Sequence, residues 1–416
     1  MLPYPLGIVE TLAISTGSRI LLIVLDGVGD AAQESETPLA AARTPHLDVL
    51  AEGASLGLST AVAPGITPGS GPGHLSLFGY DPFAYDVGRG VLSALGLGLD
   101  LAPDQVAARG NFATVDAGGT IVDRRAGRIA TELNQALIAA LAAAIPEIDG
   151  VRIDLHTEAE YRFVVRLTGS GLGGQVADSD PGRVGEAPLE PRPLADDPAD
   201  RRTARVLARF AERARQILAD LRAARDAKPP VNAVLLRGIG RKPDLPQFPA
   251  ITRMRAGAIA AYPMYRGVAR LVGMECVPMD LSGAGERTEA KLAAYEAHAA
   301  AHDFLYFHVK KIDSAGEDGD FAKKVAEIEA FDAIVPRLRA ASPDVVVVTG
   351  DHSTPVPLKA HSWHPLPVLI WSGVARPDRR RFTEADCRGG SLGTLRHLDL
   401  LPLAMANAGK LNKYGA

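Results

Sequence analysis

The chain has 416 residues, of which 47% are hydrophobic and 23% charged, a profile typical of globular proteins and long enough for two domains. Its formal net charge of −4 gives no general basic surface, which argues against nucleic acid as a partner. The longest aliphatic runs, at residues 20–25 and 345–348, fall far short of the roughly 20 residues that span a bilayer. The first residues lack the basic and apolar regions of a signal peptide, and two widely separated cysteines, Cys276 and Cys387, suit a reducing compartment. We therefore expect a cytoplasmic protein that binds neither nucleic acid nor membrane.

The first predicted strand covers residues 20–25, where RILLIVLDGVGD runs without polar interruption into a glycine-containing turn. Continuous apolarity favours a strand buried on both faces, as in a parallel sheet covered by helices. Asp26 follows this strand directly. An aspartate in such a turn often serves only the conformation of the turn, so Asp26 alone is weak evidence for a site.

Ser70 lies in the next distinctive segment, ITPGSGPGHLSLFGYDP at residues 66–82, where glycines and prolines surround its hydroxyl and His74. The glycines permit a tight turn and close backbone approach, and GHLSLFGY can continue as a short helix whose N-terminal amides favour an anion. A serine hydroxyl needs a base or a metal to become a strong nucleophile. The segment lacks the GK[ST] ending of a nucleotide-binding loop. On its own it fits a structural turn equally well, and His74 could support a ligand or only the packing.

The middle of the chain, from about residue 100 to 281, has more alternating strands and clustered arginines. Two stretches predict helices, TELNQALIAALAAAI and RTARVLARFAERARQILADLRAA, and the segment TGSGLGGQVADSDPGRVGEAPLEPRPLADDPAD between them predicts a long loop. We expect an inserted domain at 100–284, flanked by the halves of a discontinuous domain at 1–99 and 285–416.

Three further buried strands are predicted in FLYFHVKKIDSAGEDGDF, PDVVVVTGDHSTP and LPVLIWSG. Asp313 and Glu317 follow the first and would share one face of a helix, Asp351 and His352 follow the second, and His361 comes shortly after. Ligands of open α/β sheets bind where strands end at their carboxyl edge, and carboxylates and imidazoles are the usual ligands of Mn, Zn or Mg. Each residue alone fits a turn, but their recurrence at strand ends favours a metal site.

The sequences of several motifs, and their order along the chain, resemble those of one protein family. The motifs are VLDGVGD, TPHLDVLAEGASLG, TPGSGPGHLSLFGYDP, GRGVLSALG, RGNFATV, DRRAGRI, DSAGEDGDF, TGDHSTP, AHSWHPLPVLI and the terminal KYGA. They resemble the archaeal-type cofactor-independent phosphoglycerate mutases of the alkaline phosphatase superfamily, over nearly the whole chain. The resemblance implies an α/β fold in which an alkaline-phosphatase-like sheet is sandwiched by helices and carries an inserted smaller α/β domain that binds substrate and acts as a lid.

The resemblance also implies two divalent metal ions, manganese first with magnesium, cobalt or zinc as alternatives, and no 2,3-bisphosphoglycerate. By position in the motifs, the ligands of one metal are Asp26, Ser70, Asp351 and His352, and those of the other are Asp313, Glu317 and His361. Ser70 matches the nucleophile that takes the phosphoryl group of 3-phosphoglycerate. Bound glycerate then takes it back on its other hydroxyl to give 2-phosphoglycerate, a step of glycolysis and gluconeogenesis.

Several basic residues are candidates for binding this small phosphorylated substrate, because a guanidinium donates two parallel hydrogen bonds to a carboxylate or phosphate. They are Arg109, Arg124, Arg125, Arg128 and Arg237, with Lys310 beside the predicted metal ligands. The arginines of RTARVLARFAERARQ are interpreted instead as a solvated helix face.

One residue departs from the family motif, which has a histidine where this chain has Glu317. A carboxylate there would make the site harder and favour Mn or Mg over Zn. A metal-dependent phosphatase, or another phosphomutase of the superfamily, is therefore the alternative function. A catalytically silent binding protein is disfavoured because the nucleophile and the other ligands are present. The sequence leaves a homo-oligomer open.

Overall fold

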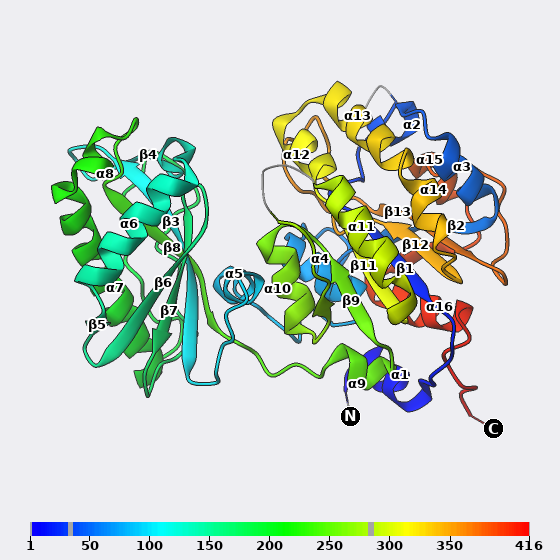
Figure 1. Ribbon diagram of the computed structural model, residues 1–416, viewed down its shortest axis with the longest axis horizontal. Coiled ribbons are helices and arrows are strands. Elements are labelled where there is room, and N and C mark those ends of the chain that lie inside the picture. Colours follow the sequence, from blue (N-terminus) through cyan, green and yellow to red (C-terminus); the bar gives the residue numbers. More distant parts are fainter. Residues whose placement is uncertain (1, 32–35, 282–286, 416) are drawn as a thin grey trace. The chain divides into compact units, whose positions relative to one another are not determined.

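The computed structural model describes residues 2–31, 36–281 and 287–415. The chain forms two compact units, one made of Met1–Asp86 and Leu245–Ala416 and the other of Val87–Asp244, drawn in Figure 1. Each unit has its own sheet and its own hydrophobic core. Within the described ranges, no helix combines the length and the apolar character needed to cross a bilayer.

The first unit is built on an eight-stranded sheet in the order β10-β9-β11-β1-β12-β13-β2-β14. In that order, the strands are Glu275–Cys276, Ala256–Ile259, Phe304–Val309, Ile20–Leu25, Val345–Thr349, Leu366–Ser372, Ala54–Thr60 and Gly393–Arg396. The predicted strand at 20–25 is β1, which lies in the middle and pairs in parallel with both β11 and β12. All six of its residues are buried, as its continuous apolarity predicts.

Helices cover both faces of this sheet. They are α1 (Leu6–Leu12), α2 (Pro38–Ala41), α3 (Pro45–Glu52), α4 (Ser70–Leu77), α9 (Phe248–Thr252), α10 (Pro263–Leu271), α11 (Thr288–His298), α12 (Lys311–Asp318), α13 (Phe321–Asp332), α14 (Val335–Ala340), α15 (Glu384–Arg388) and α16 (Leu400–Asn407). Leu21, Ile23 and Leu25 of β1 point into a core shared with α3, α11, α13 and α14. On the other face, α4 packs against α10, and Phe78 after α4 lies edge-on to Tyr306 of β11 with ring centroids 5.2 Å apart.

The carboxyl ends of β1, β11 and β12 meet at one edge, as predicted, because these strands are parallel and in register. The strand predicted in LPVLIWSG is β13, and it is buried, but it runs antiparallel to β12 and to β2. An apolar run indicates that a strand is buried but not which way it runs, so the sequence did not predict this antiparallel orientation. The reversal has a consequence, because the segment before β13, which carries His361, lies at the same edge as the ends of the parallel strands.

The second unit is built on an antiparallel sheet in the order β4-β3-β7-β6-β5, with β8 paired to β3. Its strands are β3 (Gln105–Val115), β4 (Ile121–Asp123), β5 (Glu147–Ile148), β6 (Val151–Ala159), β7 (Arg162–Thr168) and β8 (Ala233–Arg241), and its helices are α5 (Arg89–Gly96), α6 (Thr131–Ala144), α7 (Pro198–Asp220) and α8 (Arg222–Asp226). The two predicted helices are α6 and α7, and residues 169–197 between β7 and α7 contain no helix or strand, as predicted for the long loop. In Figure 1, α6 and α7 lie on one side of this sheet and α5 on the other.

Both ends of the inserted unit differ from the expected 100–284. Helix α5 at Arg89–Gly96 packs on β3 and β8, so the unit begins before residue 100. Strands β9 and β10 pair within the large sheet, so residues from Leu245 onward belong to the first unit. The expected boundary at 284/285 itself lies outside the described residues. Composition cannot show which sheet a short strand joins, because pairing is decided by distant partners.

Candidate active site

Asp26 follows β1, and its two carboxylate oxygens have different surroundings. Oδ2 accepts hydrogen bonds from the hydroxyl of Tyr265 and from Nε2 of His308 (3.1 Å), and Nζ of Lys310 lies 3.2 Å away. Oδ1 is buried, has no hydrogen-bond partner among the described residues, and lies 3.3 Å from Nε2 of His352. The donors around Oδ2 therefore hold the carboxylate so that Oδ1 faces His352.

Asp351 and Ser70 approach the same nitrogen of His352. Asp351 accepts the backbone N–H of Gly27 at Oδ1 (3.3 Å), whereas its Oδ2 is buried, without a hydrogen-bond partner in the described ranges, and 3.3 Å from Nε2 of His352. Ser70 is the first residue of α4, and its Oγ lies 3.2 Å from that nitrogen. Helix α4 can come this close because Gly73 has no side chain. A Cβ at this position would lie only 2.3 Å from the carbonyl oxygen of Asp351.

His74, whose role the sequence left open, lies one turn after Ser70 and is fully buried. Its Nδ1 lies 2.7 Å from the carbonyl oxygen of Ser70 and 3.3 Å from Oδ2 of Asp351. Burial disfavours the charged ring, but the neighbouring Asp351 carboxylate raises the pKa of His74 above its ordinary value. His74 thus links helix α4 to a candidate metal ligand.

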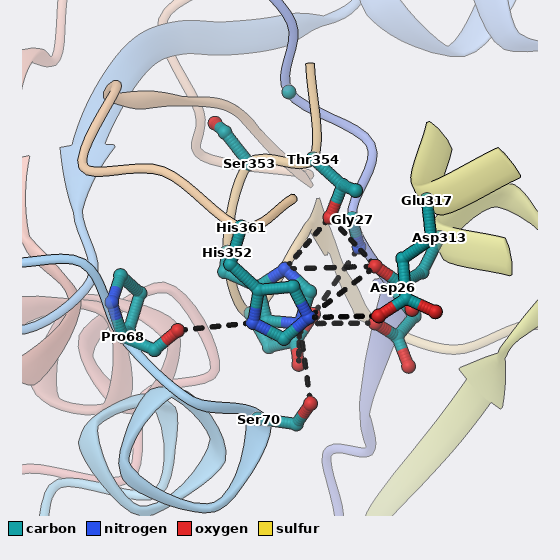
Figure 2. A network of polar contacts seen from close by, with 12 residues as sticks. Asp26, Gly27, Pro68, Ser70, Asp313, Glu317, His352, Ser353, Thr354 and His361 are labelled. Carbon is teal, nitrogen blue, oxygen red and sulfur yellow. Dashed lines mark hydrogen bonds and ion pairs between the residues drawn. The ribbon is translucent and has the colours of Figure 1, made fainter. Parts of the chain in front are cut away.

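Figure 2 shows a second group of side chains close to His352, made of Asp313, Glu317 and His361. Asp313 belongs to α12, and Nε2 of His361 lies 3.7 Å from its Oδ1 and also 3.7 Å from Oε1 of Glu317. The other ring nitrogen of His361, Nδ1, lies 3.1 Å from the carbonyl oxygen of Pro68. Donation from Nδ1 to this carbonyl leaves Nε2 with a lone pair, which is how proteins commonly orient a metal-binding histidine.

Lys310 bridges the two groups, with Nζ 3.2 Å from Oδ2 of Asp26 and 2.5 Å from Oδ2 of Asp313. Burial opposes ionisation of Asp26, but the charge of Lys310 and the hydrogen bond from His308 hold the pKa of this carboxyl well below its usual range. The same carboxylates raise the pKa of Lys310 well above its ordinary value in spite of burial. Burial lowers the pKa of His308 to about 4, so its ring is neutral near pH 7 and donates to Asp26.

These side chains fit divalent metal ions. Two sets each bring three ligand atoms within 4.8 Å of one another: Asp26, Asp351 and His352 in one, and Asp313, His352 and His361 in the other. A buried polar atom without a partner costs about 1–3 kcal/mol, and the unpartnered oxygens of Asp26 and Asp351 both face Nε2 of His352. A cation held by these atoms would satisfy both oxygens, and the mixture of carboxylate and imidazole suits Mn or Zn. Glu317, whose side chain is 55% exposed, stands at the rim.

The second unit holds an arginine cluster, which we define as Arg89, Arg109 and Arg237. Arg109 of β3 and Arg237 of β8 face each other as register partners, and α5, which begins at Arg89, packs on both strands. Burial, together with repulsion from Arg89 and Arg109, lowers the pKa of Arg237 to about 10, although Asp180 and Asp178 partly offset it. Nε of Arg109 is buried and has no hydrogen-bond partner within the described residues, but it forms an ion pair with Oε2 of Glu158 at 3.5 Å. The cluster therefore has the electrostatic character of an anion-binding site.

The other predicted substrate arginines lie in different surroundings. Arg124 donates two hydrogen bonds to Asp180, at 2.8 and 2.7 Å, so its charge is already paired. Arg125 and Arg128 are exposed around a short 3-10 turn, where the backbone N–H of Arg125 donates to Asp123. The structure therefore brings Arg109 and Arg237 together and leaves the other three outside this cluster.

Four residues of these two sites were not singled out in the sequence. Thr354, whose hydroxyl donates to Oδ1 of Asp313 (2.6 Å), and Arg89 lie inside motifs that were noted, TGDHSTP and GRGVLSALG. His308 lies near the end of an apolar strand, where a polar residue is itself a signal. Tyr265 lies in α10, a stretch that the sequence assigned to the other domain. Nothing local could have connected Tyr265 with Asp26.

Comparisons with known proteins identify similar chains. A sequence model described as 2,3-bisphosphoglycerate-independent phosphoglycerate mutase matches residues 51–223. The chain is 52% identical over 412 residues to a Thermus thermophilus protein named "Probable 2,3-bisphosphoglycerate-independent phosphoglycerate mutase", covering 98% of this chain and 99% of that one. A solved structure from Pyrococcus horikoshii matches with a TM-score of 0.81 at 29% identity, over 97% and 100% of the two chains. The cofactor-independent phosphoglycerate mutase of Thermoplasma acidophilum matches with a TM-score of 0.67 at 32% identity, over 94% and 100%. The α/β fold class and the family resemblance are thus confirmed.

Proposed function

Since the chain belongs to the family of 2,3-bisphosphoglycerate-independent phosphoglycerate mutases, we propose that it interconverts 3-phosphoglycerate and 2-phosphoglycerate through a phosphorylated Ser70. One observation carries the proposal: Oγ of Ser70 and the unpartnered oxygens of Asp26 and Asp351 all lie 3.2–3.3 Å from Nε2 of His352. This convergence brings a nucleophile and candidate metal ligands to one point at the carboxyl edge of the sheet.

The reaction runs in two balanced halves. Oγ of Ser70 attacks the phosphorus of 3-phosphoglycerate, the bond from phosphorus to the C3 oxygen breaks, and the serine proton ends on that oxygen. The C2 oxygen of bound glycerate then attacks the same phosphorus, its proton returns to Oγ of Ser70, and 2-phosphoglycerate leaves. Divalent metal ions at this site would lower the pKa of the serine hydroxyl and neutralise charge on the phosphoryl oxygens. The position of Ser70 at the first residue of α4 adds the helix N-terminal amides beside the transferred group.

We place one metal ion with Asp26, Ser70, Asp351 and His352, and the second with Asp313, Glu317 and His361. His352 is close to both groups, because its Nδ1 lies 3.9 Å from Oδ1 of Asp313. Glu317 makes the second group richer in oxygen, which favours manganese or magnesium over zinc. Lys310, which bridges Asp26 and Asp313, would balance these carboxylates and lie close to the transferred phosphoryl group.

The arginine cluster is the proposed binding site for anionic groups of the substrate. Burial and repulsion from Arg89 and Arg109 lower the pKa of Arg237 in spite of Asp180 and Asp178, and Arg109 beside it is paired with Glu158 at 3.5 Å. A carboxylate or phosphate would accept charge-assisted hydrogen bonds from their guanidinium groups and relieve their mutual repulsion. Arg124 would act indirectly, since its fork is occupied by Asp180, and the exposed Arg125 and Arg128 would contribute only long-range attraction.

The proposed reaction belongs to glycolysis and gluconeogenesis, and we place the enzyme in the cytoplasm. Cys276 and Cys387 are both free thiols, which suits a reducing compartment. The substrate is a small phosphorylated acid, and the overall charge of −4 favours no polyanionic partner.

The test supplies Mn²⁺-loaded protein with 3-phosphoglycerate and no 2,3-bisphosphoglycerate, while phosphorus NMR follows 2-phosphoglycerate and free phosphate in the same tube. We expect 2-phosphoglycerate to form with little free phosphate, and chelation to stop the reaction until Mn²⁺ is added back. Release of phosphate without the isomer would make the protein a phosphatase and contradict the mutase. Full turnover by metal-free protein would contradict the metal site alone.

A further inference from the structure

Thr354 connects the two groups of proposed metal ligands. Its hydroxyl donates to Oδ1 of Asp313 (2.6 Å) and lies 3.1 Å from Nδ1 of His352, as Figure 2 shows. The residue is fully buried, its backbone N–H donates to the carbonyl of Gly29 (3.1 Å), and its own carbonyl accepts from Nζ of Lys324 (2.9 Å). Both backbone groups of Thr354 are therefore held by hydrogen bonds, and its hydroxyl lies between Asp313 and His352.

The number of hydrogens sets the direction of these bonds. A hydroxyl donates one hydrogen, and the carboxylate of Asp313, paired with Lys310, can only accept, so the hydrogen of Thr354 goes to Asp313. The oxygen of Thr354 can then only accept from His352, so Nδ1 of His352 carries a proton. In a neutral ring this leaves the lone pair on Nε2, the atom that faces Asp26, Asp351 and Ser70.

The space for this contact depends on Gly27, which has a positive φ of 67°. A Cβ at this position would lie 2.6 Å from Oγ1 of Thr354 and 2.8 Å from Cα of Asp313. The turn after β1 therefore allows α12 and the segment after β12 to approach closely enough for the hydroxyl to reach Asp313.

We propose that Thr354 is a positioning residue that fixes the tautomer of His352 and the orientation of Asp313 together. This inference rests on the proposed metal site and goes beyond it, because Thr354 is not a ligand. Without the hydroxyl, His352 gains access to the tautomer with Nε2 protonated, which has no lone pair for a metal, and Asp313 loses a donor. Partners of this kind typically change metal affinity by about 10–100-fold.

The test compares Thr354→Val, which keeps the shape and removes the hydroxyl, with Thr354→Ser, which keeps the hydroxyl. Titration calorimetry of metal-free protein with Mn²⁺ measures affinity. We expect the valine variant to bind about 10–100-fold more weakly and the serine variant to stay within about threefold of the unchanged protein. Equal affinity in the valine variant, or equal loss in both variants, would overturn the inference, since the second result assigns the effect to packing.

A second measurement uses the unchanged protein, so it does not depend on whether the variants of Thr354 fold. Nitrogen-15 NMR of the metal-free protein reports which ring nitrogen of His352 carries the proton, with the signal identified by its loss in His352→Gln. We expect Nδ1 to be protonated, and an Nε2-protonated ring in the unchanged protein would overturn the inference. If the unchanged protein binds no divalent metal, the proposed metal site fails, while the tautomer still reports on Thr354 separately.

Discussion

The carboxyl edge of the first sheet and the arginine cluster of the second unit carry opposite electrostatic excesses. At the edge, Asp26 and Asp351 are buried, and each has one oxygen that no described residue satisfies by a hydrogen bond. In the second unit, Arg109 and Arg237 face each other across paired strands, and burial together with repulsion from Arg89 and Arg109 lowers the pKa of Arg237. We propose that the first arrangement binds a cation and the second an anion.

Arg124 shows what a charge paired within the fold looks like in the same unit. Its two hydrogen bonds to Asp180 raise its pKa above the ordinary value, whereas burial and like charges lower that of Arg237. Charges that stabilise a fold are paired within it, and charges left in excess are stabilised when a ligand binds. The comparison therefore separates binding residues from structural ones better than residue type alone.

The largest expected effect is on turnover, at the proposed nucleophile in the carboxyl edge of the first sheet. We call this edge the cation side and the arginine cluster the anion side. Ser70→Ala removes the only group proposed to accept the phosphoryl group, so turnover measured by phosphorus NMR should fall at least about 1,000-fold. Circular dichroism and the melting temperature should change little. The matched control is Ser76→Ala in the same helix, because the Ser76 hydroxyl is also buried but has no hydrogen-bond partner among the described residues. Substantial turnover by the Ser70 variant would rule out the phosphoserine route.

On the anion side, Arg237→Met should raise KM for 3-phosphoglycerate about 10–100-fold, the value of one charge-assisted hydrogen bond. Because repulsion with Arg89 and Arg109 disappears, the melting temperature should stay equal or rise. Arg241→Gln is the control, since Arg241 lies on the same strand but donates to the carbonyl of Pro103. An unchanged KM, or a clear loss of stability in the Arg237 variant, would mean that Arg237 is structural.

A pH experiment separates the two regions, because the cation side depends on buried neutral histidines. His397 donates from Nε2 to the carbonyl of Gly350 (3.1 Å), and burial lowers its pKa to about 3. The unfolded chain, with a pKa near 6.5, binds this proton first, so stability is complete above pH 6.5 and falls as the pH drops toward 3. The free energy of unfolding, measured in urea, should depend less steeply on pH in His397→Gln than in the unchanged protein. Between pH 6.5 and 4 the two slopes should differ by up to about 1.4 kcal/mol per pH unit. If the free energy of unfolding of both proteins depends on pH with the same slope, folding does not lower the pKa of His397.

The smallest expected effect concerns Glu317 at the rim of the second metal group. Glu317→His exchanges an oxygen ligand for nitrogen, so affinity for Zn²⁺ relative to Mn²⁺ should rise, by less than about tenfold because the side chain is 55% exposed. Competition titrations with the two metals measure the ratio. An unchanged ratio would indicate that Glu317 does not ligate.

The sequence by itself determined the buried strands β1, β11 and β12 and a short helix after Ser70, although α4 begins at Ser70 itself and the predicted segment GHLSLFGY begins at Gly73. Continuous apolar runs and glycine-rich turns are local signals, and they also placed Asp26 and Asp351 at strand ends. The family motifs added the roles of the ligands and of Ser70, which remain predictions until metal and substrate are tested.

Only the tertiary structure decided the direction of β13, the limits of the inserted unit and the partners of each charge. Tyr265 meets Asp26 from 239 residues away, and Arg109 meets Arg237 through strand pairing. No local sequence pattern predicts such contacts. The same apolar run can form a parallel or an antiparallel strand, and the same arginine can lie on the surface or in a binding site. Burial can be predicted from neighbours along the chain, but whether a buried charge is satisfied depends on which distant segments fold against it.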